Sequence, residues 1–247
     1  MKEKVNSIKT KIRKYTAGII FVSVLVIVIL VVELSDEFRE MAPPVEFEQV
    51  NFGTHSWLVL ERQGDRMLLL SEYILFEMAY ANRRGSNTWE DSSLREYLNH
   101  DFIYTFTPEE RALIIPVINE NPNNPRFNTD GGSDTEDLMF ILSLEEVLKY
   151  FGDSGERRRR GALINDIYNA RRIAPDINGN CDRAAWWVRT PGSGNMRVVR
   201  VNQWGMGSAR GSISISGDNS SLWLEGTTST SSDVGVRPAM WVVVDGF

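Results

Sequence analysis

The chain has 247 residues, of which 42% are hydrophobic and 10% aromatic, enough apolar surface for a folded domain with its own core. Residues 1–34 hold six basic and two acidic side chains (+4), so the formal net charge of −6 leaves −10 for the remainder. An acidic domain does not favour nucleic-acid binding, and the single cysteine, Cys181, excludes an internal disulfide.

The N-terminal segment has the composition of a membrane anchor. Ala17–Val32 contains no charged residue, and with Leu34 included a helix of this length approaches the roughly 30 Å hydrocarbon core of a bilayer. Basic residues dominate positions 2–14 and acidic residues positions 33–40, so the positive-inside rule places the N-terminus in the cytoplasm. A cleaved signal peptide is the alternative, although no small-residue cleavage site follows the apolar run, and both interpretations export the domain.

A short stalk and a single domain are expected after the anchor. The stalk combines charges with the Pro43-Pro44 pair, which resists helix and sheet, and no second linker follows it. The expected division is a cytoplasmic basic tail at 1–16, a single-pass transmembrane anchor at 17–34, a stalk at 35–46 and one extracytoplasmic domain at 47–247.

The first part of the domain predicts a β-hairpin and then helices. "HSWLVLE" and "RMLLLSE" are β-rich runs on either side of Gln63-Gly64-Asp65, a turn signal. Three capping boxes then predict helix starts, and Gly152 is the expected C-cap of the last helix. The boxes are Ser93 with Glu96, Thr107 with Glu110 beside Pro108, and Ser143 with Glu146.

The remainder of the domain predicts mainly strands. An irregular loop at 119–137 leads into "LMFIL", which we expect to be a strand. Four further β-rich runs follow, separated by Gly, Pro and Asn clusters: "AAWWVRT", "MRVVRVNQW", "GSISIS" and "GVRPAMWVVV". Strands, helices and then strands predict an α+β domain whose first and last segments share a sheet.

Seven segments in this order resemble a bacterial domain family catalogued only as a domain of unknown function. They are "FGTHSWLVLE", "LLLSEYIL", "TWEDSSLREYLN", "FTPEERALI", "DLMFILSLEEVLKYF", "WWVRTPG" and "GVRPAMWVVV". Members of that family typically read W-W-L-R-S-P-G and G-V-R-P-A at the last two. This chain departs at Tyr97, where Trp is usual, and at Val188 and Thr190, which replace Leu and Ser.

The family is similar to the C-type-lectin-like group, which also includes formylglycine-generating enzymes. The resemblance implies a mixed or antiparallel sheet with packed helices, with the Trp-rich strand and the late G-x-R-x-A strand in its core. It supplies no activity, because that group contains enzymes, lectins and adhesins alike. The structural signature residues are Trp186, Trp187, Arg189, Gly235, Arg237 and Pro238.

No catalytic or metal-binding constellation stands out. Cys181 has no identifiable base beside it, and His55 and His100 lack the spacing of zinc ligands. The loop carboxylates Asp130, Asp134, Glu136 and Asp137 are suitable oxygen ligands for Ca²⁺, but their order matches no known calcium loop and the same residue types suit turns. We therefore expect no catalytic residue, metal or cofactor.

The segment 192–233 mixes aromatic, amide and guanidinium side chains with Gly and Ser, a mixture that suits recognition as well as ordinary strand-and-loop structure. The candidate ligand-binding residues are Asn195, Arg197, Asn202, Gln203, Trp204, Met206, Arg210, Asn219 and Trp223. The sequence thus favours a membrane-anchored, non-catalytic recognition module for an extracytoplasmic protein or glycan. The alternatives are an enzyme whose site is assembled from residues remote in sequence and a structural protein of envelope assembly.

Overall fold

The computed structural model describes part of the chain. The described residues are 23–26, 45–83, 85, 87–153, 163–164, 168–178, 185–194, 196–203, 211–214 and 229–244. Contacts divide the chain into two units, Met1–Met41 and Ala42–Phe247, and the fold below is that of the second.

The expected anchor lies mostly outside the described residues. Within 17–34 only residues 23–26 are described, as helix, and the tail at 1–16 and most of the stalk at 35–46 are likewise outside. In the part of the chain that is described, no helix is both long and apolar enough to cross a membrane.

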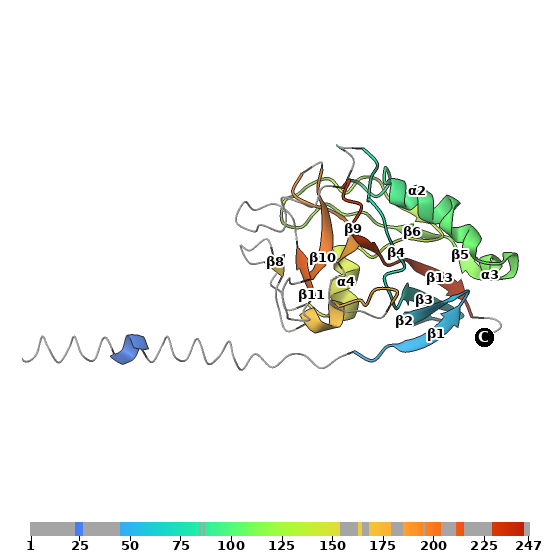
Figure 1. Ribbon diagram of the computed structural model, residues 1–247, viewed down its shortest axis with the longest axis horizontal. Coiled ribbons are helices and arrows are strands. Elements are labelled where there is room, and N and C mark those ends of the chain that lie inside the picture. The colour runs from blue at the N-terminus through green and yellow to red at the C-terminus, as the bar shows by residue number, and fades with distance from the viewer. Residues whose placement is uncertain are drawn as a thin grey trace, which may run out of the picture. The chain divides into compact units, whose positions relative to one another are not determined.

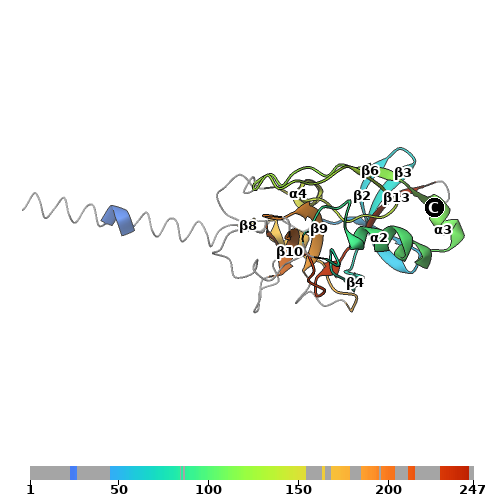
Figure 2. The same ribbon diagram turned by 90° about the horizontal axis from the view of Figure 1, so that it is seen from above.

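The second unit is an α+β domain with mostly antiparallel sheets, as the order of elements predicts. Its five-stranded sheet has the order β1 (Glu48–Phe52), β2 (His55–Gln63), β3 (Arg66–Ser71), β13 (Ala239–Val243) and β5 (Ile114–Ile115). Its six-stranded sheet has the order β4 (Phe76–Glu77), β12 (Gly235–Val236), β9 (Trp186–Pro191), β10 (Val198–Gln203), β11 (Gly211–Ser214) and β8 (Leu163–Ile164). A third sheet pairs β6 (Val117–Asn119) with β7 (Thr135–Asp137). In both views β2 and β3 lie beside β13, away from β8 and β10 (Figure 1 and Figure 2).

The predicted hairpin and the shared sheet are both confirmed. β2 and β3 pair antiparallel on either side of Gly64, whose φ of 61° lies in the left-handed region that glycine adopts without steric cost. β13 pairs antiparallel with β3, and Ala239 lies opposite Leu70, so strands from the first and last parts of the domain are neighbours in one sheet.

The helices begin close to where their capping residues predict. They are α2 (Ser93–His100), η1 (Phe102–Thr105), α3 (Pro108–Leu113), α4 (Leu144–Phe151) and η3 (Asn169–Arg172). The capping boxes of α3 and α4 are confirmed, and Gly152 is the C-cap of α4. The N-cap of α2 is Ser92 and not Ser93, because the Ser92 hydroxyl accepts from the backbone N–H of Arg95.

Two predicted strands differ from the structure. "LMFIL" is not a strand: Phe140 makes an isolated bridge to Ala239, and the apolar run reflects burial rather than a sheet ladder. "GVRPAMWVVV" divides into β12 and β13 at Arg237-Pro238. Pro238 has no backbone N–H to donate to a neighbouring strand, so the ladder is interrupted there. At this break the Arg237 guanidinium donates to the carbonyl oxygen of Ser71 at 2.7 Å.

The adjacent Trp186 and Trp187 are fully buried and have different partners. The Trp186 indole N–H donates to the carbonyl oxygen of Arg172, whereas that of Trp187 donates to the carbonyl oxygen of Met78. Successive side chains of a strand point to opposite faces, and the two indoles accordingly pack in different parts of the core. Both tryptophans therefore serve the fold, with no indole surface left for a ligand.

Candidate functional site

A polar hollow of about 740 Å³ lies between α2 and the end of β7, and we call it the α2 cleft. It is lined by Glu90, Asp91, Ser92, Arg95, Glu96, Asn99, His100, Pro116, Glu136, Asp137 and Leu138. Five of these side chains recur at three- and four-residue spacing along α2 and its cap, so they share one face of the helix. The opposite face of α2 buries Leu94 and Leu98 in the core.

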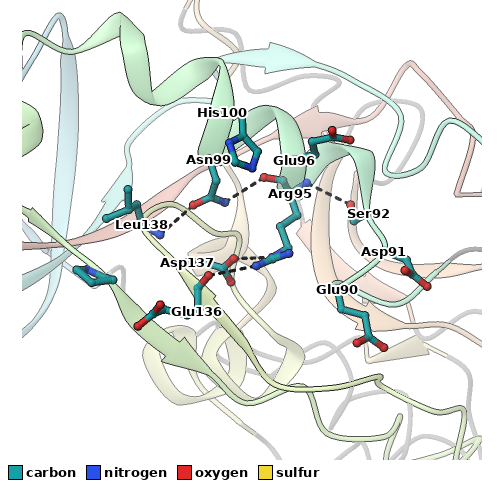
Figure 3. Close-up of a pocket in the computed structure, with 11 residues that line it drawn as sticks. Glu90, Asp91, Ser92, Arg95, Glu96, Asn99, His100, Glu136, Asp137 and Leu138 are labelled. Atoms are coloured by element: carbon teal, nitrogen blue, oxygen red, sulfur yellow. Dashed lines mark hydrogen bonds and ion pairs between the residues drawn. The ribbon is translucent and has the colours of Figure 1, made fainter.

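Asp137 is the hydrogen-bonding centre beneath the cleft. Its Oδ1 accepts from Arg95 Nε at 2.6 Å (Figure 3). Its Oδ2 accepts from the indole of Trp89 at 2.9 Å, the amide of Asn119 at 2.9 Å and the hydroxyl of Thr135 at 2.7 Å. A buried carboxylate is tolerated when its oxygens are hydrogen-bonded and a cation is in contact, and Asp137 has both.

Asn99 joins α2 to the segment that follows β7 on the other side of the cleft. Its Oδ1 accepts from the backbone N–H groups of Leu138 and Met139, and its Nδ2 donates to the carbonyl oxygens of Met139 and Arg95. Figure 3 shows this side chain between α2 and Leu138. The cleft is therefore built on a helix and a strand end that are held together by side-chain hydrogen bonds.

The charge of the cleft is negative. Glu90, Asp91, Glu96 and Glu136 line it, and the last three are exposed, whereas Arg95 is the one permanent cation among the lining residues. Arg95 is already paired with Asp137, and its Nη2 donates to the carbonyl oxygen of Glu136. The four remaining carboxylates create a potential that attracts a cation.

Three of the four loop carboxylates considered for calcium accept hydrogen bonds from the protein. Asp130 accepts from the backbone N–H of Gly132, Asp134 accepts from that of Asn121, and Asp137 is buried in the network above. In the described part of the chain, no three His, Cys, Asp or Glu side chains lie close enough together to hold a metal ion.

The two histidines have different environments. His55 on β2 is half-buried and stacks on Phe102 with ring centroids 6.2 Å apart, and burial lowers the pKa of its imidazole. His100 is exposed in the last turn of α2 and lines the α2 cleft. Cys181 lies outside the described residues.

The candidate ligand-binding residues of 192–233 are only partly described. Arg197 precedes β10 and is absent from the lining of the α2 cleft, and Asn202 and Gln203 end β10, where the strand pairs with β11. The turn before Arg197 is fixed because Asn87 Nδ2 donates to the carbonyl oxygens of Gly194 and Arg197. Six candidates lie outside the described residues: Asn195, Trp204, Met206, Arg210, Asn219 and Trp223.

The structural signature residues all lie in the interior. Trp186, Trp187, Arg189, Gly235, Arg237 and Pro238 are buried. Arg237 stacks its guanidinium 5.4 Å from the Trp186 ring centroid and 5.6 Å from that of Phe151, and burial lowers its pKa to about 9, so it stays charged at neutral pH.

Sequence reasoning missed the α2 cleft. The signal was the helical spacing of polar residues in "SSLREYLNH", which marks one polar face, but surface helices commonly have such a face. What makes it a cleft is the distant Glu136-Asp137 pair, whose approach the sequence spacing does not reveal.

A family model described as a domain of unknown function (DUF6273) matches residues 64–244, and the chain therefore belongs to this family. No curated protein and no solved structure matches the sequence.

Proposed function

We propose that this member of the DUF6273 family is a non-catalytic recognition module, anchored in a bacterial membrane by its N-terminal segment, whose α2 cleft binds a cationic group of an extracytoplasmic ligand. The observation that supports it is the charge of the cleft: four carboxylates line it besides Asp137, which is already paired with the one permanent cation of the lining. A ligand ammonium or guanidinium group fits this chemistry, and a side chain of a protein or an amino group on a glycan supplies one.

The rigidity of the cleft supports binding as well. Side-chain hydrogen bonds from Asn99 and Asp137 fix the relative position of α2 and β7, so little order has to be gained when a ligand enters. The hollow of about 740 Å³ also falls in the size range of small-ligand pockets.

The proposal also includes the location of the domain outside the membrane and its membership in a fold group. The basic tail and apolar run support an N-in orientation, and the WWVRT and GVRPA segments support membership in the C-type-lectin-like group. A second contact through 192–233 remains part of the proposal, since that segment carries amide, aromatic and arginine side chains.

The binding test uses the full chain in detergent and a fluorescent tetralysine peptide, with tetraglutamate as the opposite-charge probe. We expect fluorescence anisotropy to show saturable binding of tetralysine at low salt and none of tetraglutamate. The double variant Glu96→Gln/Glu136→Gln removes two exposed cleft carboxylates and should weaken tetralysine binding about 2- to 30-fold, because each exposed charge contributes about 0.2–1 kcal/mol.

A matched control changes net charge equally outside the cleft. Glu77 on β4 and Glu109 on α3 are exposed and absent from the cleft lining, so Glu77→Gln/Glu109→Gln should leave binding within about twofold of wild type. Equal losses in both double variants, or no tetralysine binding at all, would show that the cleft is not the cation site.

An enzyme is the second candidate, because the α2 cleft groups His100 with the carboxylate of Glu96 one helical turn away. Its test is a screen of chromogenic nitrophenyl esters, phosphates and glycosides with wild type and His100→Gln. Turnover that is present in wild type and lost in the variant supports catalysis; turnover that is absent in both supports recognition alone.

A further inference from the structure

A second hollow, of about 550 Å³, lies beside α4, shares no lining residue with the α2 cleft, and is called here the α4 groove. It is lined by Glu61, Gln63, Leu68, Ile118, Asn119, Glu120, Pro122, Ser143, Glu145, Glu146, Lys149, Tyr150, Arg189 and Trp241. The two hollows meet different parts of the β6–β7 hairpin: β6 contributes Ile118 and Asn119 to the groove, and β7 contributes Glu136 and Asp137 to the cleft.

The groove has accessible apolar surface from β13 and β6, and its lining also includes Leu68 of β3. Leu68 and Trp241 are directly paired residues of β3 and β13, so their side chains share one face of the five-stranded sheet. Leu68 is buried and Trp241 is half-buried. Ile118 from β6 is 65% exposed and adds an aliphatic edge. An apolar ligand face therefore finds the half-buried indole of Trp241, with the Arg66 guanidinium 5.6 Å from its ring centroid, and the exposed side chain of Ile118.

One wall of the groove is a closed polar cluster centred on Glu61. Its Oε2 accepts from Lys149 Nζ at 2.6 Å and from the hydroxyl of Tyr150 at 2.5 Å. Its Oε1 accepts from Gln63 Nε2 at 2.6 Å. These hydrogen bonds lower the pKa of Glu61 to about 2, so the cluster holds one negative and one positive charge at neutral pH.

The second ion pair of the groove joins a buried arginine to a partly exposed glutamate. Arg189, 4% exposed, contacts Glu146 at 2.5 Å. The groove lining thus holds four carboxylates and two cations, whereas the lining of the α2 cleft holds five carboxylates and one permanent cation. Glu120 and Glu145 also line the groove, and both are exposed.

We infer that the α4 groove binds a neutral carbohydrate, with the C–H face of one pyranose ring against Trp241 and its hydroxyls on the Glu61–Lys149–Tyr150 cluster. An anionic ligand would meet the groove carboxylates, and a purely apolar one would remove water from the polar wall without replacing its hydrogen bonds. A sugar ring combines an apolar face with hydroxyl edges, which are the two surfaces that the groove offers. The inference is independent of the proposed cation site.

Isothermal titration tests the inference, with the full chain in a detergent that has no sugar headgroup and with cellobiose, maltose and N,N′-diacetylchitobiose as probes. We expect saturable binding of at least one of them. Tyr150→Phe keeps the ring and removes only the hydroxyl, so it should weaken binding about 2- to 13-fold, the effect of one hydrogen bond. Trp241→Leu removes the indole and should reduce binding further.

The controls separate this site from the α2 cleft and from loss of folding. Tyr104→Phe removes a hydroxyl from a tyrosine that is 67% exposed and absent from the groove lining, and it should leave sugar affinity unchanged. Glu96→Gln/Glu136→Gln should also leave it unchanged, while far-ultraviolet circular dichroism confirms that each variant is folded. Binding of none of the three sugars, or a wild-type affinity in Tyr150→Phe, overturns the inference.

Discussion

The replacement Asp137→Ala tests the network beneath the α2 cleft most directly. In the wild type this buried carboxylate accepts four hydrogen bonds: one from Arg95, and one each from Trp89, Asn119 and Thr135. Truncation removes all four acceptor contacts at once. The three neutral donors are buried and lose their acceptor, whereas Arg95 is 29% exposed along its side chain and is able to recover hydration.

The expected cost follows from these contacts. An unsatisfied buried donor costs about 1–3 kcal/mol, and breaking a buried ion pair by removing one partner costs about 3–5 kcal/mol. Residues in one network do not contribute additively, so we expect a total loss of about 3–5 kcal/mol in the free energy of unfolding. For a domain of this size that corresponds to a fall of roughly 6–20 °C in Tm.

Asp137→Asn provides the matched comparison. With its oxygen in the Oδ2 position, the asparagine still accepts from the three neutral donors, and only the contact with Arg95 is lost. We expect Asp137→Asn to lower the free energy of unfolding by about 1.5–3 kcal/mol, the contribution of one hydrogen bond to a charged group. Urea unfolding followed by tryptophan fluorescence measures this loss. A loss below about 1 kcal/mol in Asp137→Ala, or an equal loss in both variants, would refute the account of Asp137 as a four-donor centre.

Three further predictions concern pH and packing. Hydrogen bonds hold the pKa of Glu61 at about 2, below its ordinary value of 4.5. The stability that Glu61 contributes is therefore full above pH 4.5 and disappears as the pH falls through 2. Glu61→Gln should remove this part of the pH dependence of the free energy of unfolding, measured by denaturant titrations at several pH values. Burial lowers the pKa of His55, so the unfolded chain binds the proton more readily and the free energy of unfolding should fall as the pH drops below about 6.5. His55→Phe, which keeps a ring against Phe102, should flatten that dependence between pH 7.5 and 5.5. In Gly235→Ala the new Cβ would lie 2.5 Å from Ile74 Cγ2, and this overpacking should lower the free energy of unfolding by about 1–3 kcal/mol. An unchanged midpoint of chemical denaturation would contradict the prediction.

The elements that could be predicted from the sequence depend on short-range chemistry. The turn at Gly64 and the capping boxes of α3 and α4 are set by residues no more than three positions apart, and the structure confirms them. The start of α2 was placed one residue late because Ser92 and Ser93 are both suitable caps, and only the backbone conformation decides between them. The prediction of a strand at "LMFIL" is wrong because an apolar run indicates burial but does not specify strand pairing.

The α2 cleft was not predictable because its parts meet through tertiary contacts. Arg95 and Asp137 are 42 residues apart, and the Asp and Gly content of the sequence before Asp137 equally suits turns or calcium. Its role depends on Trp89, Asn119 and Thr135 all facing one carboxylate. Periodicity identifies the polar face of α2, but it does not say which distant segment faces it.

The arginine of the WWVRT strand shows why sequence motifs and ligand sites need not coincide in this domain. A guanidinium has five N–H donors, and those of Arg189 all have partners: Asn121 Oδ1, the carbonyl oxygens of Ile141 and Glu120, and both carboxylate oxygens of Glu146. These contacts join β9 to α4 and to irregular segments that have no sheet ladder of their own, and they leave no donor for a ligand. Charged groups at the surface are better placed to contact a ligand than buried ones, which is why the proposed recognition rests on the carboxylates of the α2 cleft and not on the buried motif arginines.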